Sequence, residues 1–412
     1  MAVALPGAHD MNNPLIFTGD ADSALRRLKL LCRTHGVAVD STDLEAATSL
    51  DALLQKIPVI DKQGLSDFAA RERERFLSEG ILFSETSGST GEPLPTPRNQ
   101  LDLQWNILNQ INAYKRHLSP GDDRIAIVHP SILSPFVEAT AMALRELSVG
   151  YVRVFPIPGL CDYQRIYDVF QRYRISAVMT TPTLAYKVFY ELKKIGNGVL
   201  PSGIRHVLLT GESISNANMR NMDAVVGVSG AAKPFVYGSS ETAVLMYGKE
   251  DGSYRPYLDD FVFEVHRQGD AAEDGSVTGI LVVSWLRDGL LPIVRYNTGD
   301  IFNVRTDPDS GELIFRALGR VGTGDVSMQR TIDEAIFTLP ENVYDYSVRD
   351  DGSRLEIHIV TESSSNQRDT ATVEQQLASA IRGREISCTL NNDDARFHEF
   401  SPVPKIRRYV RC

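Results

Sequence analysis

The stretch "ISAVMTTPTLAYKVFYELKKIG", residues 175–196, decides the fold class, because a short apolar run leads directly into an amphipathic one. Residues 175–180 predict a strand, and the spacing of apolar residues over 183–196 predicts a helix. Similar runs lie on both sides, namely "RIAIVHP" (124–130), "FVEATAMALREL" (136–147), "GYVRVFP" (150–156), "DYQRIYDVFQRYR" (162–174), "IRHVLLTGE" (204–212), "NANMRNMDAVVG" (216–227) and "KPFVYGSSE" (233–241). Strands that alternate with helices predict a parallel α/β sheet with helical crossovers.

Small polar loops follow these predicted strands, at the sheet edge where α/β proteins bind ligands. A further loop, "ETSGSTGEP" (85–93), combines glycines with hydroxyl side chains. Glycine lets backbone N–H groups approach an anion closely, and Ser or Thr hydroxyls add donors. The loop therefore favours a polyphosphate site, with a surface linker as the alternative when it is considered alone.

The rest of the chain divides into three further regions. Residues 21–80 are predicted mostly helical, and 255–318 consist of strands. The glycine-rich "GRVGTGD" (319–325) is the best boundary, and a small α/β unit follows it. We therefore expect an α/β protein whose large N-terminal domain (1–319) has mixed and parallel sheets flanked by helices plus a β-rich subdomain. A small mobile C-terminal α/β domain (320–412) completes it.

Composition argues against several classes of partner. The net charge is −10 and no basic cluster follows a helix face, which argues against nucleic acid or an anionic membrane as partner. The four cysteines and eight histidines are scattered, so neither a disulfide framework nor a zinc site is indicated. No run approaches the roughly 18 apolar residues of a membrane span. The N-terminal residues do not resemble a signal peptide, and the scattered cysteines fit a reducing cytoplasm best.

Four segments together carry a family resemblance. They are "TSGSTGEP" (86–93), "YGSSET" (237–242), "YNTGD" (296–300) and "LGR" (318–320). Their order and separations resemble the adenylate-forming enzymes, which include acyl- and aryl-CoA ligases and nonribosomal adenylation domains. "KIPVIDKQGL" (56–65), "LLTGES" (208–213) and "LPIVRYNTGD" (291–300) resemble the phenylacetate–CoA ligase branch. The resemblance implies that ATP activates a small, aromatic carboxylic acid as acyl-AMP, and that a nucleophile then takes the acyl group.

The resemblance assigns the first loop to the β- and γ-phosphates of ATP. The residues concerned are Thr86, Ser87, Gly88, Ser89, Thr90 and Gly91. The loop is not a Walker A motif, because no GK[ST] follows it. Glu92 and Leu94 stand where the family often carries a lysine, so we expect Mg²⁺ to balance the phosphate charge.

The second motif is assigned to the metal and the adenine. Glu241 would ligate Mg²⁺, as a hard oxygen ligand of a hard cation. Tyr237 would stack on adenine and Gly238 would leave space for the acyl carboxylate. The same resemblance places Ser239, Ser240 and Thr242 at the nucleotide, together with the backbone of Gly211, Glu212 and Ser213.

Four further residues belong to the implied ATP site or support it. Asp300 would accept both ribose hydroxyls, although a turn-capping aspartate is the alternative. Arg320 would reach the ribose or the α-phosphate, and Arg295 would support the Asp300 loop. Lys405 would stabilise the transition state of adenylation. A solvated basic tail around Arg407 is the rival interpretation of that lysine.

The acyl pocket and the acceptor are less defined. His129 and Phe136, with Tyr237 and Gly238, fall where the family lines its acyl pocket, although His129 could equally be a buried, hydrogen-bonded histidine. "MQRTIDEAIF" (328–337) has no glycine where the branch has a glycine-bearing loop beside its pantetheine tunnel. CoA is the first acceptor to consider, and an amine, a hydroxyl or a carrier protein is the alternative.

Two other classes of function compete with the ligase. The chain could be a non-catalytic relative that binds a nucleotide, or a phosphotransfer enzyme that releases ADP. The missing Walker lysine argues against the second. The branch also suggests a homodimer.

Overall fold

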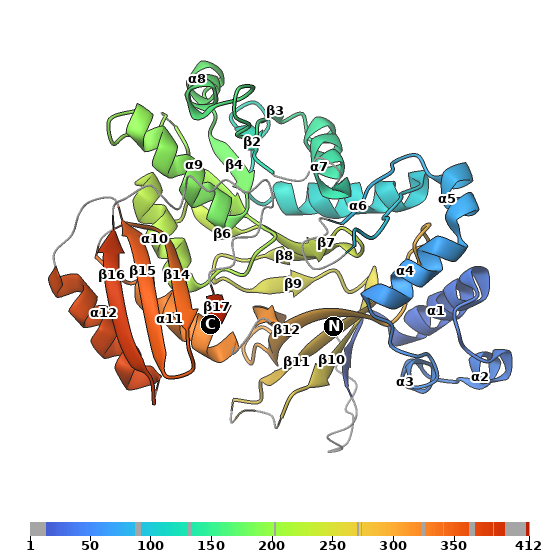
Figure 1. Cartoon of the computed structure of the whole chain (residues 1–412). Coiled ribbons are helices and arrows are strands. Elements are labelled where there is room, and N and C mark those ends of the chain that lie inside the picture. Colours follow the sequence, from blue (N-terminus) through green and yellow to red (C-terminus); the bar gives the residue numbers. More distant parts are fainter. Residues whose placement is uncertain are drawn as a thin grey trace.

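The computed structural model describes residues 14–86, 92–129, 134–201, 203–269, 272, 274–322, 326–340, 342–361, 367–381, 383–391 and 409–411. Three sheets form its framework (Figure 1). The predicted combination of parallel and mixed sheets flanked by helices is confirmed. In the part of the chain that is described, no helix is long and apolar enough to cross a membrane.

The predicted parallel sheet is present and has five strands. In spatial order they are β3 (Gly150–Arg153), β2 (Arg124–Ile127), β4 (Ala177–Thr180), β5 (His206–Leu209) and β6 (Ala232–Pro234). Each neighbouring pair is parallel. The associated helices are α6 (Gln100–Tyr114), α7 (Pro135–Glu146), α8 (Tyr163–Tyr173), α9 (Pro182–Ile195) and α10 (Asn216–Val226). The "TTP" loop works as a helix start, because Thr181 caps α9 through the Leu184 N–H and Pro182 occupies its first turn.

The strand-rich region forms an eight-stranded sheet. In spatial order its strands are β1 (Leu15–Phe17), β10 (Phe261–Arg267), β11 (Val277–Trp285), β12 (Tyr296–Thr306), β13 (Leu313–Arg320), β9 (Tyr254–Pro256), β8 (Ala243–Gly248) and β7 (Val236–Ser239). The single strand predicted over 233–241 is wrong. Strand β6 ends at Pro234, and β7 pairs antiparallel with β8 in the other sheet. The fully buried Phe235 makes this step, so the "YGSSET" motif lies where the two sheets meet.

The N-terminal helices pack against the eight-stranded sheet. They are α1 (Ala21–His35), α2 (Ser41–Ala46), α3 (Leu50–Leu54), α4 (Lys62–Arg71) and α5 (Arg73–Glu79). Between α3 and α4, Ile60 forms a parallel bridge with Tyr296. The Ile60 N–H donates to the Arg295 carbonyl, and the Ile60 carbonyl accepts from the Asn297 N–H. The "KIPVIDKQGL" segment is therefore bound beside the start of "YNTGD".

The C-terminal residues form a separate four-stranded sheet with two helices. Its elements are α11 (Val326–Ile336), β14 (Val343–Asp350), β15 (Arg354–Thr361), α12 (Gln367–Ala380), β16 (Glu385–Asn391) and β17 (Tyr409–Arg411). This unit packs against α9 and α10 (Figure 1), where the Tyr186 and Phe337 rings stack with centroids 5.5 Å apart. The Asn221 side chain also exchanges two hydrogen bonds with the backbone of Val343. The loop expected over 328–337 is wrong: it is helix α11, because Ile332 and Ile336 belong to one buried face.

Candidate active site

The loop predicted to bind phosphate is carried by a short hairpin. Backbone hydrogen bonds join Leu82 to Arg98, Ser84 to Thr96 and Thr86 to Leu94. The Thr86 hydroxyl accepts from the Leu94 N–H at 2.9 Å. Thr86 therefore closes the base of the loop. The loop residues Ser87, Gly88, Ser89, Thr90 and Gly91 lie outside the described residues, as does Lys405.

Glu241 lies in a turn that its neighbours hold rigidly. The Ser239 and Thr242 hydroxyls are 2.9 Å apart, and each accepts a hydrogen bond from the other residue's backbone N–H. The Glu241 carboxylate is buried, and its Oε1 accepts from the Tyr296 hydroxyl at 2.9 Å. Its Oε2 has no hydrogen bond to any described residue. Ser239 and Thr242 thus fix the turn, and one carboxylate oxygen of Glu241 stays available.

The Glu241 site suits the metal expected with ATP. Among the residues that the structure describes, no three His, Cys, Asp or Glu side chains gather as a metal site. Mg²⁺ in nucleotide enzymes usually has one or two carboxylate ligands, and it takes its other ligands from substrate phosphates and water. A single buried carboxylate therefore fits Mg²⁺ that arrives with ATP.

Asp300 and Tyr237 lie close together beside the Glu241 turn. We call the region of Glu241, Tyr296, Tyr237, Asp300 and Arg320 the rim. The Tyr237 hydroxyl donates to Asp300 Oδ2 at 2.7 Å, and the Tyr237 ring packs edge-on against Phe302 at 4.8 Å. Burial, followed by the Asp300 carboxylate, raises the pKa of Tyr237 well above its ordinary value, so this phenol stays protonated. In this structure Tyr237 holds the carboxylate of Asp300, the residue predicted to bind the ribose hydroxyls.

Arg320 faces Asp300 across the sheet. The two residues are register partners in β12 and β13. Arg320 Nη1 lies 3.8 Å from Asp300 Oδ1, and Nη2 donates to the Thr298 carbonyl at 3.0 Å. Arg320 is half-exposed, so its guanidinium lies at the solvent edge of the rim. Tyr296 donates to the Glu241 carboxylate and lies four residues before Asp300 in β12. It therefore lies between Glu241 and the Asp300–Arg320 pair along the chain.

Gly238 has a structural reason of its own. A Cβ on this residue would lie 2.0 Å from the Ala243 carbonyl oxygen, because β7 and β8 approach closely there. The glycine predicted to leave room for the acyl carboxylate is already required by the strand pair.

The "TGES" turn lies at the end of β5, close to helix α9. Gly211 adopts a φ of +82°, in the left-handed region that glycine favours. The Glu212 carboxylate accepts from the Thr183 N–H at 3.1 Å and from its hydroxyl at 2.7 Å. The Glu212 side chain is therefore committed to the start of α9. The assignment of the Gly211–Ser213 backbone to the nucleotide stays a prediction.

Two of the four residues predicted for the acyl pocket, His129 and Phe136, lie together. The His129 and Phe136 rings have centroids 5.9 Å apart, at the ends of β2 and the start of α7. Both are partly buried. They offer aromatic surface at the carboxyl edge of the parallel sheet.

Three further residues contact the Glu241 turn and were given no role from the sequence. Arg98 donates through Nη2 to the carbonyls of Ser240 (2.5 Å) and Glu241 (3.2 Å). Trp285 donates from its indole N–H to the Thr242 carbonyl at 3.0 Å. Tyr296 bonds the Glu241 carboxylate, as described above. Only Tyr296 had a signal, since it belongs to the "YNTGD" motif.

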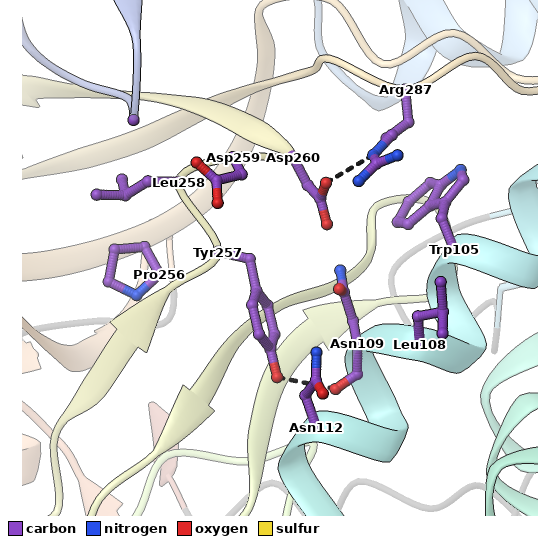
Figure 2. Close-up of a pocket in the computed structure, with 11 residues that line it drawn as sticks. Trp105, Leu108, Asn109, Asn112, Pro256, Tyr257, Leu258, Asp259, Asp260 and Arg287 are labelled. Atoms are coloured by element: carbon purple, nitrogen blue, oxygen red, sulfur yellow. Dashed lines mark hydrogen bonds and ion pairs between the residues drawn. The ribbon is translucent and has the colours of Figure 1, made fainter. Parts of the chain in front are cut away.

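A cavity of about 580 Å³ lies away from these residues (Figure 2). It opens between α6 and the turn before β10, where Tyr257 donates to the Asn109 carbonyl and Arg287 pairs with Asp260. None of the predicted site residues lines it. Its connection to the rim is Trp105, whose ring packs edge-on against Trp285 with centroids 5.0 Å apart.

The fold and the rim define a nucleotide-dependent enzyme of the adenylate-forming class. The family model of the AMP-binding enzymes matches residues 44–277, more than half of the chain, and the chain belongs to this family. The predicted membership of the adenylate-forming superfamily is thereby confirmed. The resemblance to the phenylacetate–CoA ligase branch stays a prediction.

Solved structures show the same fold at low sequence identity. The chain is similar to 2-hydroxyisobutyryl-CoA ligase in the postadenylation state in complex with 2-HIB-AMP, with 16% identity and a TM-score of 0.75, over 99% of this chain and 94% of that one. It is also similar to an open conformation of that ligase in complex with 2-HIB-AMP and CoA, with 16% identity and a TM-score of 0.62, over 98% and 95% of the two chains. A search of curated proteins gives no match.

Proposed function

We propose that this protein uses Mg·ATP to activate a small carboxylic acid as its acyl-AMP, and then transfers the acyl group to a nucleophile. One observation carries the proposal, within a chain of the AMP-binding family. The Glu241–Tyr296 pair and the Tyr237–Asp300–Arg320 group both include a residue of β12, where two sheets meet. Each polar group suits a different part of ATP.

In the first step a carboxylate oxygen of the acid attacks the α-phosphorus. The bond between the α-phosphorus and the α–β bridging oxygen of ATP breaks, and pyrophosphate leaves with its electron pair. Asp300 would hold the ribose hydroxyls, and Glu241 would hold the Mg²⁺ that accompanies the phosphates. Lys405 and Arg320 would balance charge near the α-phosphate. The acid is already ionised at neutral pH, so the step needs positioning rather than a general base.

In the second step the nucleophile attacks the acyl carbon and AMP leaves with the electrons of the carbon–oxygen bond. A CoA thiol is the first acceptor to test, because the 2-hydroxyisobutyryl-CoA ligase structures share the fold. Helix α11 favours a second candidate, an amine or hydroxyl acceptor, because it occupies the segment where the branch resemblance expects a glycine loop. The ring pair of His129 and Phe136 makes aromatic acids the first substrates to test.

The direct test is acid-dependent exchange of labelled pyrophosphate into ATP, followed by mass spectrometry of acyl products with and without CoA. We expect exchange with some aromatic or small aliphatic acids, and AMP as the released nucleotide. A protein that binds ATP and gives no exchange across a broad acid panel is a nucleotide-binding relative instead. Release of ADP would indicate phosphotransfer.

A further inference from the structure

A buried arginine connects the hairpin of the 86–93 loop to the Glu241 turn. Arg98 is 1% exposed and stands at the base of that hairpin, where its backbone pairs with Leu82. Its guanidinium lies 5.2 Å from the centroid of the Trp285 ring. Through Nη2 it donates to the carbonyls of Ser240 and Glu241. One side chain thus holds two segments whose sequence separation exceeds 140 residues.

The charge of Arg98 is poorly matched within the described residues. There it has no carboxylate at ion-pair distance, and its Nε and Nη1 atoms are buried without a hydrogen-bond partner. Burial lowers the pKa of Arg98, while the Asp102 and Glu241 carboxylates act in the opposite direction. A buried guanidinium with incomplete pairing costs free energy. Packing alone gives no reason to keep a charge at this position.

We propose that Arg98 is a positioning residue: it fixes the main chain of the Glu241 turn, and with it the metal-binding carboxylate, against the hairpin that carries the 86–93 loop. This inference rests on the proposed function, since it assigns Arg98 to the binding of Mg·ATP. Arg98 acts through the backbone of Ser240 and Glu241. Its substitution should therefore change the Mg²⁺ requirement more than the affinity for the acid.

The variants Arg98→Lys and Arg98→Met test this role, with Arg255→Lys as a matched control at another buried arginine, which donates to Glu312 and Ser253 outside the candidate site. Pyrophosphate exchange is measured against Mg²⁺ at saturating ATP, together with the KM for the acid and the melting temperature. A lysine is shorter and lacks the planar guanidinium that lies over the Trp285 ring, so it should hold the two carbonyls less well. We expect Arg98→Lys to stay folded and its half-saturating Mg²⁺ concentration to rise about tenfold. The KM for the acid should stay unchanged, as should the Mg²⁺ requirement of Arg255→Lys.

A second measurement does not depend on turnover. Both tryptophans of the chain, Trp105 and Trp285, belong to this cluster, and Trp285 bonds the Thr242 carbonyl beside Glu241. We expect Mg·ATP, added without any acid, to change the intrinsic fluorescence of the wild-type protein. The apparent Kd from this titration should rise about tenfold in Arg98→Lys.

The outcomes separate this inference from the proposed function. Exchange activity with an unchanged Mg²⁺ requirement in Arg98→Lys would overturn the positioning role and leave the function in place. An equal change in Arg98→Lys and Arg255→Lys would also overturn it, because general destabilisation then explains both. A wild-type protein without exchange, but with a fluorescence titration weakened in Arg98→Lys, would refute the function and support the positioning of Mg·ATP. Should Arg98→Met fail to fold, the lysine variant decides.

Discussion

Arg98 and Arg295 are both buried beside the candidate active site, and their surroundings are opposite. Arg295 forms two hydrogen bonds with Glu264, at 2.9 and 2.6 Å, and its Nη1 donates to the carbonyls of Leu54 and Ile57. Arg98 has two carbonyls and an aromatic face, and within the described residues no paired carboxylate.

The difference separates a structural charge from one that belongs to the site. Arg295 joins the end of α3 to the strand β10, and every contact it makes is internal. Its carbonyl also accepts from Ile60, so it fixes the chain leading into the Asp300 turn. A buried charge therefore has to be interpreted from its partners, because burial alone is the same in both cases.

The largest expected effect comes from breaking the matched pair. Arg295→Met leaves Glu264, which is fully buried, without its guanidinium partner, and the His266 imidazole at 3.4 Å makes no hydrogen bond to it. We expect the free energy of unfolding to fall by about 3–5 kcal/mol, because an uncompensated buried charge is costly. Urea denaturation measures this. The double variant Glu264→Gln/Arg295→Met should recover part of the loss, and a loss below about 1 kcal/mol in the single variant would contradict the structural role.

A second prediction concerns the acid near Arg98. Burial raises the pKa of Asp102 to about 6, against the opposing effect of Arg98. The unfolded pKa is lower, so the folded protein binds more protons between these values. Stability should therefore fall as pH rises from about 4 to about 6, by roughly 2–3 kcal/mol, and stay constant above.

The variant Asp102→Asn isolates this contribution. It keeps an acceptor for the Leu290 N–H and removes the charge, so we expect the pH dependence between 4 and 6 to weaken. Urea midpoints measured across this range, for both proteins, provide the test. Parallel pH profiles would show that Asp102 ionises normally, and would remove one reason to treat the Arg98 cluster as electrostatically unmatched.

The carboxylate of Asp300 allows a test of the rim itself. Asp300→Asn removes the charge proposed to hold the ribose hydroxyls, so the KM for ATP should rise at least about tenfold. Stability should change little, since the Asp300 side chain is partly exposed and an asparagine keeps an oxygen acceptor for the Tyr237 hydroxyl. The control Tyr237→Phe keeps the carboxylate and loses the phenol donor, and we expect a smaller change in KM. A large loss of stability in Asp300→Asn would place it with Arg295, among the structural residues.

Much of this fold could be predicted because local patterns agree with it. The alternation of strand and helix over 124–227 gives the parallel sheet, and helix starts such as Thr181 are visible in the sequence. The exchange between sheets at Phe235 could not be predicted, because "KPFVYGSSE" has the pattern of one strand. Helix α11 was also missed. Its segment was interpreted from the family resemblance, and the helical spacing of Ile332 and Ile336 was not used.

The candidate site shows the same division. Glu241 and Asp300 belong to short motifs, so the amino-acid sequence is enough to indicate them. Arg98 and Trp285 come from segments far apart in the chain, and their contact depends on how the hairpin and β11 pack. A sequence pattern gives no signal for such a contact, since neither residue belongs to a motif.

The smallest expected effect lies where the C-terminal unit contacts α10, and it compares a neutral donor with the guanidinium of Arg295. Asp333 accepts from the Ser215 hydroxyl at 2.7 Å and the Tyr346 hydroxyl at 3.0 Å, and both of these donors are neutral. Tyr346→Phe should lower the free energy of unfolding by about 1 kcal/mol, well below the loss in Arg295→Met. The Mg²⁺ requirement should stay constant. If the rate of acyl transfer changed instead, with stability unaltered, the hydroxyl would govern the placement of the C-terminal unit during the reaction.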